Sequence, residues 1–180
     1  MSSFLIFCSI TLASLITLTA HAQTVFMKPA EALKQIFHDS KEVVPDKKTL
    51  TPDQKSCAEK LLGAKIDKLD WAFQVARTDQ RIDGYAVIDN EMGKTEPITF
   101  LTAITPLGEV KEVEVLVYRE PYGSEIHDAR YLKQYRGKTA KDPVRVGGDI
   151  SNISGATISS RSVALGVKRD LAIWSCVYGR

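Results

Sequence analysis

Trp71-Ala72-Phe73-Gln74-Val75-Ala76 marks the point at which the hydrophobic pattern of the chain changes to a period of two. That period is typical of a β-strand, because successive side chains of a strand point to opposite faces of its sheet. Three later segments repeat the pattern, each after a turn signal: 85–88 after Asp83-Gly84, 98–102 after Gly93, and 113–117 after Leu107-Gly108. We therefore expect an antiparallel meander of about four strands, with short polar connections at 89–94 and 105–108.

Helical periodicity flanks this meander on both sides. Residues 28–38 have apolar side chains at helical spacing, and residues 51–62 begin with Thr-Pro-Asp, which favours a helix start, and stop at Gly63. On the C-terminal side we expect a helix over 124–137 and a long helix over 158–177. The predicted fold class is α+β, an antiparallel β-meander packed with helices.

The first 22 residues are typical of a secretory signal peptide. They contain no Lys, Arg, Asp or Glu, and they end in Ala20-His21-Ala22, a small-x-small cleavage pattern. Their apolar run, residues 4–18, is shorter than the roughly 20 residues that span a membrane. We expect cleavage after Ala22 and a periplasmic or secreted protein, with an uncleaved membrane anchor as the alternative. We divide the chain into this signal peptide (1–22), an N-terminal helical segment (23–66) and a C-terminal domain (67–180).

Composition restricts the function classes. The 24 basic and 22 acidic side chains leave a net charge of only +2, which does not favour nucleic-acid binding. Cys57 and Cys176 are the cysteines outside the signal peptide, and they form no C-x-x-C or zinc pattern. An oxidising compartment permits a disulfide between them, although the sequence alone leaves this open. We interpret the charged cluster at 41–48 as a solvated linker, and we predict no metal site.

A small-residue loop leads directly into the predicted long helix. It reads Gly-Gly-Asp-Ile-Ser-Asn-Ile-Ser-Gly-Ala-Thr over residues 147–157. A helix N-terminus exposes unpaired backbone N–H groups and the positive end of the helix dipole, and both stabilise a phosphate. Two other interpretations stay open: Ser154 or Thr157 as a simple N-cap, and Asn152-Ile153-Ser154 as a glycosylation sequon.

Residues 154–163, Ser-Gly-Ala-Thr-Ile-Ser-Ser-Arg-Ser-Val, closely resemble the attachment motif of the FMN-binding domain family. This domain occurs in one subunit of the sodium-pumping quinone reductase, in a related subunit of the Rnf complex and in many exported proteins. There a flavin transferase esterifies the FMN phosphate to the threonine at the position of Thr157. The resemblance implies covalent FMN on Thr157, in a site that includes Ser154, Gly155, Ala156, Ile158 and Ser159. Where the family often has Asp, this chain has Ser151, with Asp149 further upstream.

A second stretch is also similar to this family. Residues 118–126 and 132–138 resemble the segment that follows the last meander strand and lies beside the flavin. By that likeness Glu120, Tyr122 and Gly123 border the isoalloxazine ring, although Tyr122-Gly123 also fits an ordinary turn. The resemblance covers roughly residues 84–174 and makes 67–180 the FMN-binding domain, with the long C-terminal helix following the attachment loop.

The sequence therefore predicts an exported flavoprotein that carries FMN on Thr157 and transfers electrons outside the cytoplasm. Its partners would be a flavin transferase for maturation, and redox proteins or a membrane electron-transport complex. Two alternatives stay open. The chain could be an accessory subunit of such a complex, or an exported binding module without flavin, in which the Ser-Gly-Ala-Thr motif only caps a helix.

Overall fold

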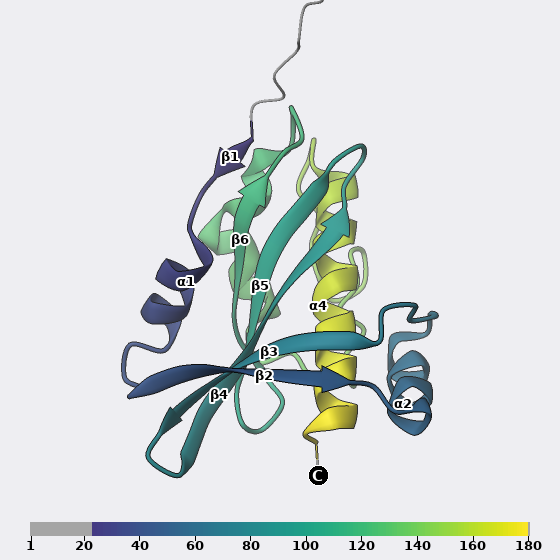
Figure 1. Cartoon of the computed structure of the whole chain (residues 1–180). Helices are drawn as coiled ribbons and strands as arrows, with labels where there is room; N and C mark the ends of the chain where they lie inside the picture. The colour runs from purple at the N-terminus through teal and green to yellow at the C-terminus, as the bar shows by residue number, and fades with distance from the viewer. Residues whose placement is uncertain (1–22, 180) are drawn as a thin grey trace, which may run out of the picture.

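The computed structural model describes residues 23–179, whose strands form one twisted antiparallel sheet (Figure 1). The predicted signal peptide, residues 1–22, lies outside the described residues. The strand order is β1-β6-β5-β4-β3-β2. The strands are β1 (Thr24–Val25), β2 (Glu42–Thr49), β3 (Asp70–Thr78), β4 (Arg81–Met92), β5 (Pro97–Ile104) and β6 (Val110–Tyr118). The meander β3 to β6 is therefore confirmed as the centre of the sheet.

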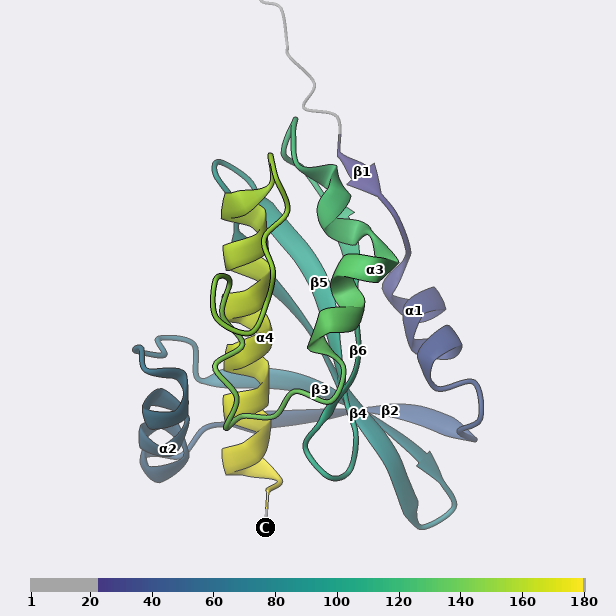
Figure 2. The same cartoon turned by 180° about the vertical axis from the view of Figure 1, so that it is seen from behind.

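Helices cover the two faces of this sheet, and the α+β class is confirmed. The long α4 (Thr157–Val177) and the segment with α3 (Ala129–Leu132) lie side by side on the face seen in Figure 2. Short 3₁₀ turns, η1 (Ser124–His127) and η2 (Lys133–Tyr135), flank α3. On the opposite face lies α1 (Pro29–Ile36), and α2 (Pro52–Leu62) packs beside the C-terminal half of α4.

The period of two along the strands separates two hydrophobic clusters. Phe73, Val87 and Phe100 belong to the larger cluster, which packs against α4 residues such as Val167. The alternate positions form a smaller cluster with α1, which comprises Ala32, Ile36, Phe37, Ala76, Ala86, Leu101, Ala103 and Leu116. Both faces of the central strands are therefore buried, as expected of a sheet with helices on both sides.

The predicted turn at Asp83-Gly84 is wrong, because both residues lie inside β4. The chain turns earlier, at Asp79, which has a positive φ of 57°. The Asp83 carboxylate accepts hydrogen bonds from Thr78 Oγ1 and Arg81 Nε and so stabilises that turn. A Cβ on Gly84 would lie 2.8 Å from the ring of Phe37, so this glycine provides room for an aromatic side chain.

The predicted connections of the meander are partly correct. The hairpin at 105–108 is confirmed, since β5 ends at Ile104 and β6 begins at Val110. The connection expected at 89–94 is shorter, because 89–92 still belong to β4. These polar residues are tolerated in the strand because Arg169 of α4 pairs with both Asp89 and Glu91.

The solvated linker expected at 41–48 is wrong, because most of it forms β2, the edge strand paired with β3. Alternate β2 side chains are exposed, and Pro45 is tolerated there because an edge strand has one unpaired side. The segment 23–66 thus adds strands to the sheet of the C-terminal domain, besides the two expected helices. The second of these helices begins as predicted, with Thr51 accepting the Gln54 N–H, and stops at Gly63.

The single helix predicted over 124–137 is divided into η1, α3 and η2. Asp128 interrupts it, since its backbone is extended (ψ 125°) and its carboxylate caps α3 by accepting the Arg130 N–H. Asp often makes such local bonds in preference to continuing a helix. The long helix expected over 158–177 is confirmed as α4, starting one residue earlier.

A disulfide joins Cys57 of α2 to Cys176 of α4, with a Cα–Cα distance of 6.0 Å. It answers the question that the sequence left open and ties α2 to the C-terminal end of α4. Within residues 23–179, none of the helices has the length and apolar content to cross a bilayer.

Candidate functional site

The N-terminus of α4 has no side-chain cap. Its N-cap is Ala156, which has no side-chain acceptor, so the interpretation of Ser154 or Thr157 as the cap is wrong. Thr157 is the first helical residue, and its Oγ1 accepts a hydrogen bond of 2.8 Å from Asn152 Nδ2. Within residues 23–179, the backbone N–H groups of Thr157, Ile158 and Ser159 have no hydrogen-bond acceptor. The helix thus begins with several unused donors and the positive end of its dipole.

This helix end opens on a cleft with a volume of about 690 Å³. Three segments line it: 94–95 from the β4–β5 turn, 120–122 after β6, and 155–159 at the start of α4. In Figure 1 this is the end of α4 farthest from the C-terminus. Two large apolar side chains of the cleft are exposed, Tyr122 by 84% and Ile158 by 48%. Such apolar surfaces next to unused polar donors suit a planar ligand with an anionic group.

Glu120 fixes one wall of the cleft. Its carboxylate accepts hydrogen bonds from the Thr95 N–H (2.6 Å), Thr95 Oγ1 (2.8 Å) and the Glu96 N–H (3.0 Å). Burial would raise the pKa of Glu120, but the backbone N–H groups of Glu96 and Thr95 outweigh it and lower the pKa. Gly93 makes this approach possible, because a Cβ there would lie 2.6 Å from the Glu120 carboxylate. Glu120 therefore holds the β4–β5 turn, and its oxygens are engaged by the protein.

A buried hydroxyl pair fixes the opposite wall. Tyr118, 1% exposed, donates a hydrogen bond to the Tyr122 carbonyl (2.5 Å) and lies 2.8 Å from Ser159 Oγ. Burial raises the pKa of Tyr118, and the bond to Ser159 opposes this in part, so the phenol stays protonated at neutral pH. Gly123 packs behind the wall with a φ of 88°, and a Cβ there would lie 2.8 Å from the Tyr118 hydroxyl. Ser159 thus connects α4 to the backbone that carries Tyr122.

The structure brings most of the predicted site residues together. Seven of them line the cleft, namely Glu120, Tyr122, Gly155, Ala156, Thr157, Ile158 and Ser159. Ser154 is exposed and Gly123 is buried behind the wall, and neither lines the cleft. The sequence reasoning missed Lys94, Thr95 and Pro121 as lining residues. Gly93, interpreted as a turn signal, and the polar connection expected at 89–94 were the signals near Lys94 and Thr95.

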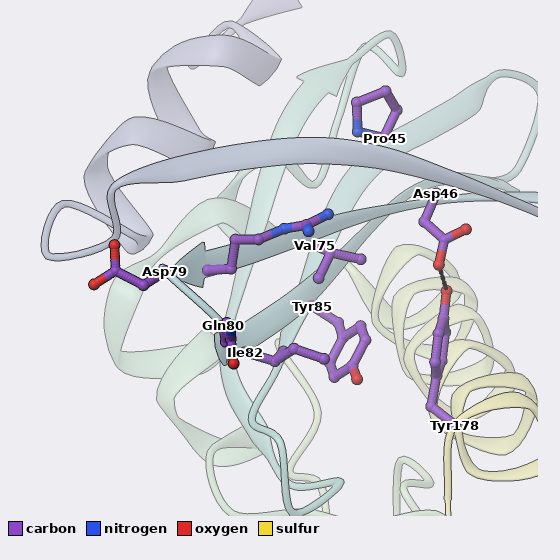
Figure 3. A pocket seen from close by; sticks show the side chains of 9 residues that line it. Pro45, Asp46, Val75, Asp79, Gln80, Ile82, Tyr85 and Tyr178 are labelled. Atoms are coloured by element: carbon purple, nitrogen blue, oxygen red, sulfur yellow. Dashed lines mark hydrogen bonds between the residues drawn. The ribbon is translucent and has the colours of Figure 1, made fainter.

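A smaller hollow, of about 460 Å³, lies at the other end of α4 (Figure 3). It is lined by Pro45, Asp46, Val75, Arg77, Asp79, Gln80, Ile82, Tyr85 and Tyr178. There the Tyr178 hydroxyl donates a hydrogen bond to Asp46 across the gap (Figure 3). Tyr178 follows the last residue of α4, so this hollow is about 30 Å from Thr157 at the 1.5 Å rise of an α-helix. It contains none of the residues of the predicted attachment motif.

Comparisons with known proteins give two matches. Residues 93–172 match the family model of the FMN-binding domain, and this range includes the whole cleft. The family resemblance inferred from the attachment motif is thereby confirmed for those residues. Among solved structures, the crystal structure of Shewanella oneidensis NqrC is similar, with 17% sequence identity and a TM-score of 0.49, over 83% of this chain and 84% of that one. The search of curated proteins found no match.

Proposed function

We propose that the FMN-binding domain at residues 93–172 carries FMN as a phosphate ester of Thr157 and uses it to transfer electrons outside the cytoplasm. The observation that carries this proposal is the position of the Thr157 hydroxyl. It lies on the first residue of an uncapped helix, at the edge of a cleft inside the matched domain.

The start of α4 fits a phosphate. The N–H groups of Thr157, Ile158 and Ser159 can donate to phosphate oxygens, and the helix dipole stabilises the negative charge without a lysine. Gly155 has a φ of 84°, and a Cβ there would meet nothing within 4 Å. This glycine thus supplies the backbone turn and keeps the approach to the helix end open.

The cleft also fits a flavin ring. Its volume is within the roughly 300–1,000 Å³ of small-molecule sites, and Tyr122 exposes a flat aromatic face toward solvent. Tyr122 and Ile158 can cover the apolar part of the ring, while the β4–β5 turn held by Glu120 supplies polar groups. When bound, FMN supplies the redox chemistry, and the protein orients it and limits its contact with water.

Export is part of the proposal. The Cys57–Cys176 disulfide supports it, because disulfides persist mainly in oxidising compartments. The signal-peptide pattern of residues 1–22 points the same way. Outside the cytoplasm a protein has no FMN pool from which to replace a lost cofactor, so a covalent bond is an advantage there.

Thr157→Ala tests the proposal directly. The variant should fold, because Thr157 is not the cap of α4, and it should carry no flavin after co-expression with an active flavin transferase. Thr157→Ser keeps a hydroxyl and should be modified. Ser154→Ala should also be modified, because Ser154 lies outside the cleft. Flavin fluorescence of the protein band after denaturation is the measurement. Fluorescent Thr157→Ala would place the attachment elsewhere, and a colourless wild-type protein would refute the flavoprotein assignment.

A further inference from the structure

We infer that Asn152 is a positioning residue for flavin attachment, which holds the Thr157 hydroxyl in the orientation for attack on phosphorus. The inference rests on the proposed function and assigns a role that the attachment motif, residues 154–163, does not include. Asn152 Nδ2 donates a hydrogen bond of 2.8 Å to Thr157 Oγ1. No other hydrogen bond of the Thr157 hydroxyl is found within residues 23–179.

The loop around Asn152 is fixed on both sides. Upstream, the Ser151 N–H donates to Gln134 Oε1 at 2.8 Å. Downstream, the Ala156 N–H donates to the Ile153 carbonyl at 3.1 Å and closes the turn that contains Gly155. Asn152 itself is exposed, so its side chain is not held by core packing. The backbone therefore fixes the position of the Asn152 Cα, and the hydrogen bond to Thr157 Oγ1 orients its side-chain amide.

The direction of this hydrogen bond matters for the chemistry. Because Asn152 donates, it occupies one lone pair of Oγ1 and leaves the hydroxyl proton available to a base. The second lone pair can then face the incoming phosphorus. A side chain that accepted from Thr157 would instead engage the hydroxyl proton and compete for it with a base of the transferase.

The step itself requires an activated donor, because forming an ester from FMN and an alcohol in water is unfavourable. We take the donor to be an FMN phosphoanhydride, of the class of flavin dinucleotides. Thr157 Oγ1 forms a bond to the FMN phosphorus, and the anhydride P–O bond breaks. The nucleoside monophosphate leaves with that electron pair, and the hydroxyl proton passes to a base of the transferase. The Asn152 N–H that donates to Oγ1 favours this orientation of the hydroxyl. After the ester has formed, the same N–H remains near the phosphate.

The experiment measures the rate of attachment on the full mature chain with purified flavin transferase and flavin adenine dinucleotide. Asn152→Ala removes the donor, and Asn152→Asp replaces it with an isosteric acceptor that also repels phosphate. The control is Asn90→Asp, because Asn90 already accepts a hydrogen bond from Thr99 Oγ1 (2.7 Å) in the sheet. Intact mass at successive times gives kcat and KM for the protein substrate, and thermal unfolding checks the fold.

We expect kcat to fall roughly two- to tenfold in Asn152→Ala, the equivalent of one lost hydrogen bond. It should fall further in Asn152→Asp, while KM and the melting temperature stay at wild-type values and Asn90→Asp is unaffected. Wild-type kcat in either Asn152 variant, or a rise in KM alone, would overturn the positioning role and leave the proposed function intact. A wild-type chain that accepts no flavin would overturn both.

Discussion

Tyr118→Phe is expected to loosen the cleft wall at a cost that the structure allows us to estimate. The substitution keeps the ring and removes the hydroxyl that contacts the Tyr122 carbonyl and Ser159 Oγ. Tyr118 and Ser159 are both buried, so water cannot replace the contact between their hydroxyls without rearrangement. Each buried polar group left without a partner costs about 1–3 kcal/mol. We expect a loss of about 2–3 kcal/mol in the free energy of unfolding.

For a chain of this size that loss corresponds to a melting temperature lower by roughly 4–12 °C, at about 2–4 °C per kcal/mol. Urea and thermal unfolding of both proteins measure it, and a double-mutant cycle with Ser159→Ala isolates the hydroxyl pair. The control is Tyr131→Phe, which removes a hydroxyl 3.1 Å from that of Tyr135, outside the cleft. Only Tyr118→Phe should increase the quenching of bound flavin by iodide. The reasoning would be refuted if the unfolding free energy of Tyr118→Phe lay within about 0.5 kcal/mol of wild type, roughly the range of neutral substitutions. Strictly additive effects of the two single mutants would refute it as well.

Three further predictions concern Gly123, the hold of Glu120 on the β4–β5 turn, and the pH dependence of stability due to Glu114. Gly123→Ala should lower the free energy of unfolding by roughly 1–3 kcal/mol or more, because the new Cβ would meet the Tyr118 hydroxyl. Gly137→Ala is the control: it has open space around it, so only the strain of its positive φ should destabilise it. Urea titration compares the two variants. The pKa of Glu120 is lowered in the folded protein, so its carboxylate stabilises the fold above the unfolded value of 4.5 and loses this contribution as the pH falls below it. The difference in unfolding free energy between wild type and Glu120→Gln should therefore shrink in acid. A difference that stays constant with pH would contradict this. Burial raises the pKa of Glu114 to about 7. The free energy of unfolding of the wild type should therefore fall by about 1–2 kcal/mol between pH 5 and 8, a value that allows for solvent screening of a half-exposed carboxylate. Glu114→Gln should show no such fall.

Periodicity was sufficient to predict the elements that build the site. The strands β3 to β6 and the helix α4 have long, regular apolar patterns, so their type follows from local sequence. The N-terminus of α4 was predictable to within one residue because small residues precede the apolar run. What the pattern did not indicate was that the helix lacks a cap, since both Ser154 and Thr157 are good capping residues.

Interactions between distant segments account for the errors. The resemblance placed Glu120 beside the flavin, and Glu120 lines the cleft, but nothing near it in sequence indicates that its carboxylate binds the backbone of a turn 24–25 residues earlier. The charged strand β2 resembles a linker in sequence, because edge strands tolerate polar residues and proline. Asp83-Gly84 is typical of a turn in sequence, but Gly84 lies inside β4, where its missing Cβ leaves room for the ring of Phe37 from another element. None of these partners can be identified from residues that are near in sequence.

Attachment of FMN to Thr157 is the central claim, and peptide mass spectrometry tests it most directly. The mature protein, purified after export from cells with an active flavin transferase, would be digested with trypsin under denaturing conditions. The account predicts that the peptide of residues 146–161 gains the mass of one FMN less one water, and that fragmentation places this mass on Thr157. An unmodified peptide, or the same mass located on Ser154, Ser159 or Ser160, would contradict it.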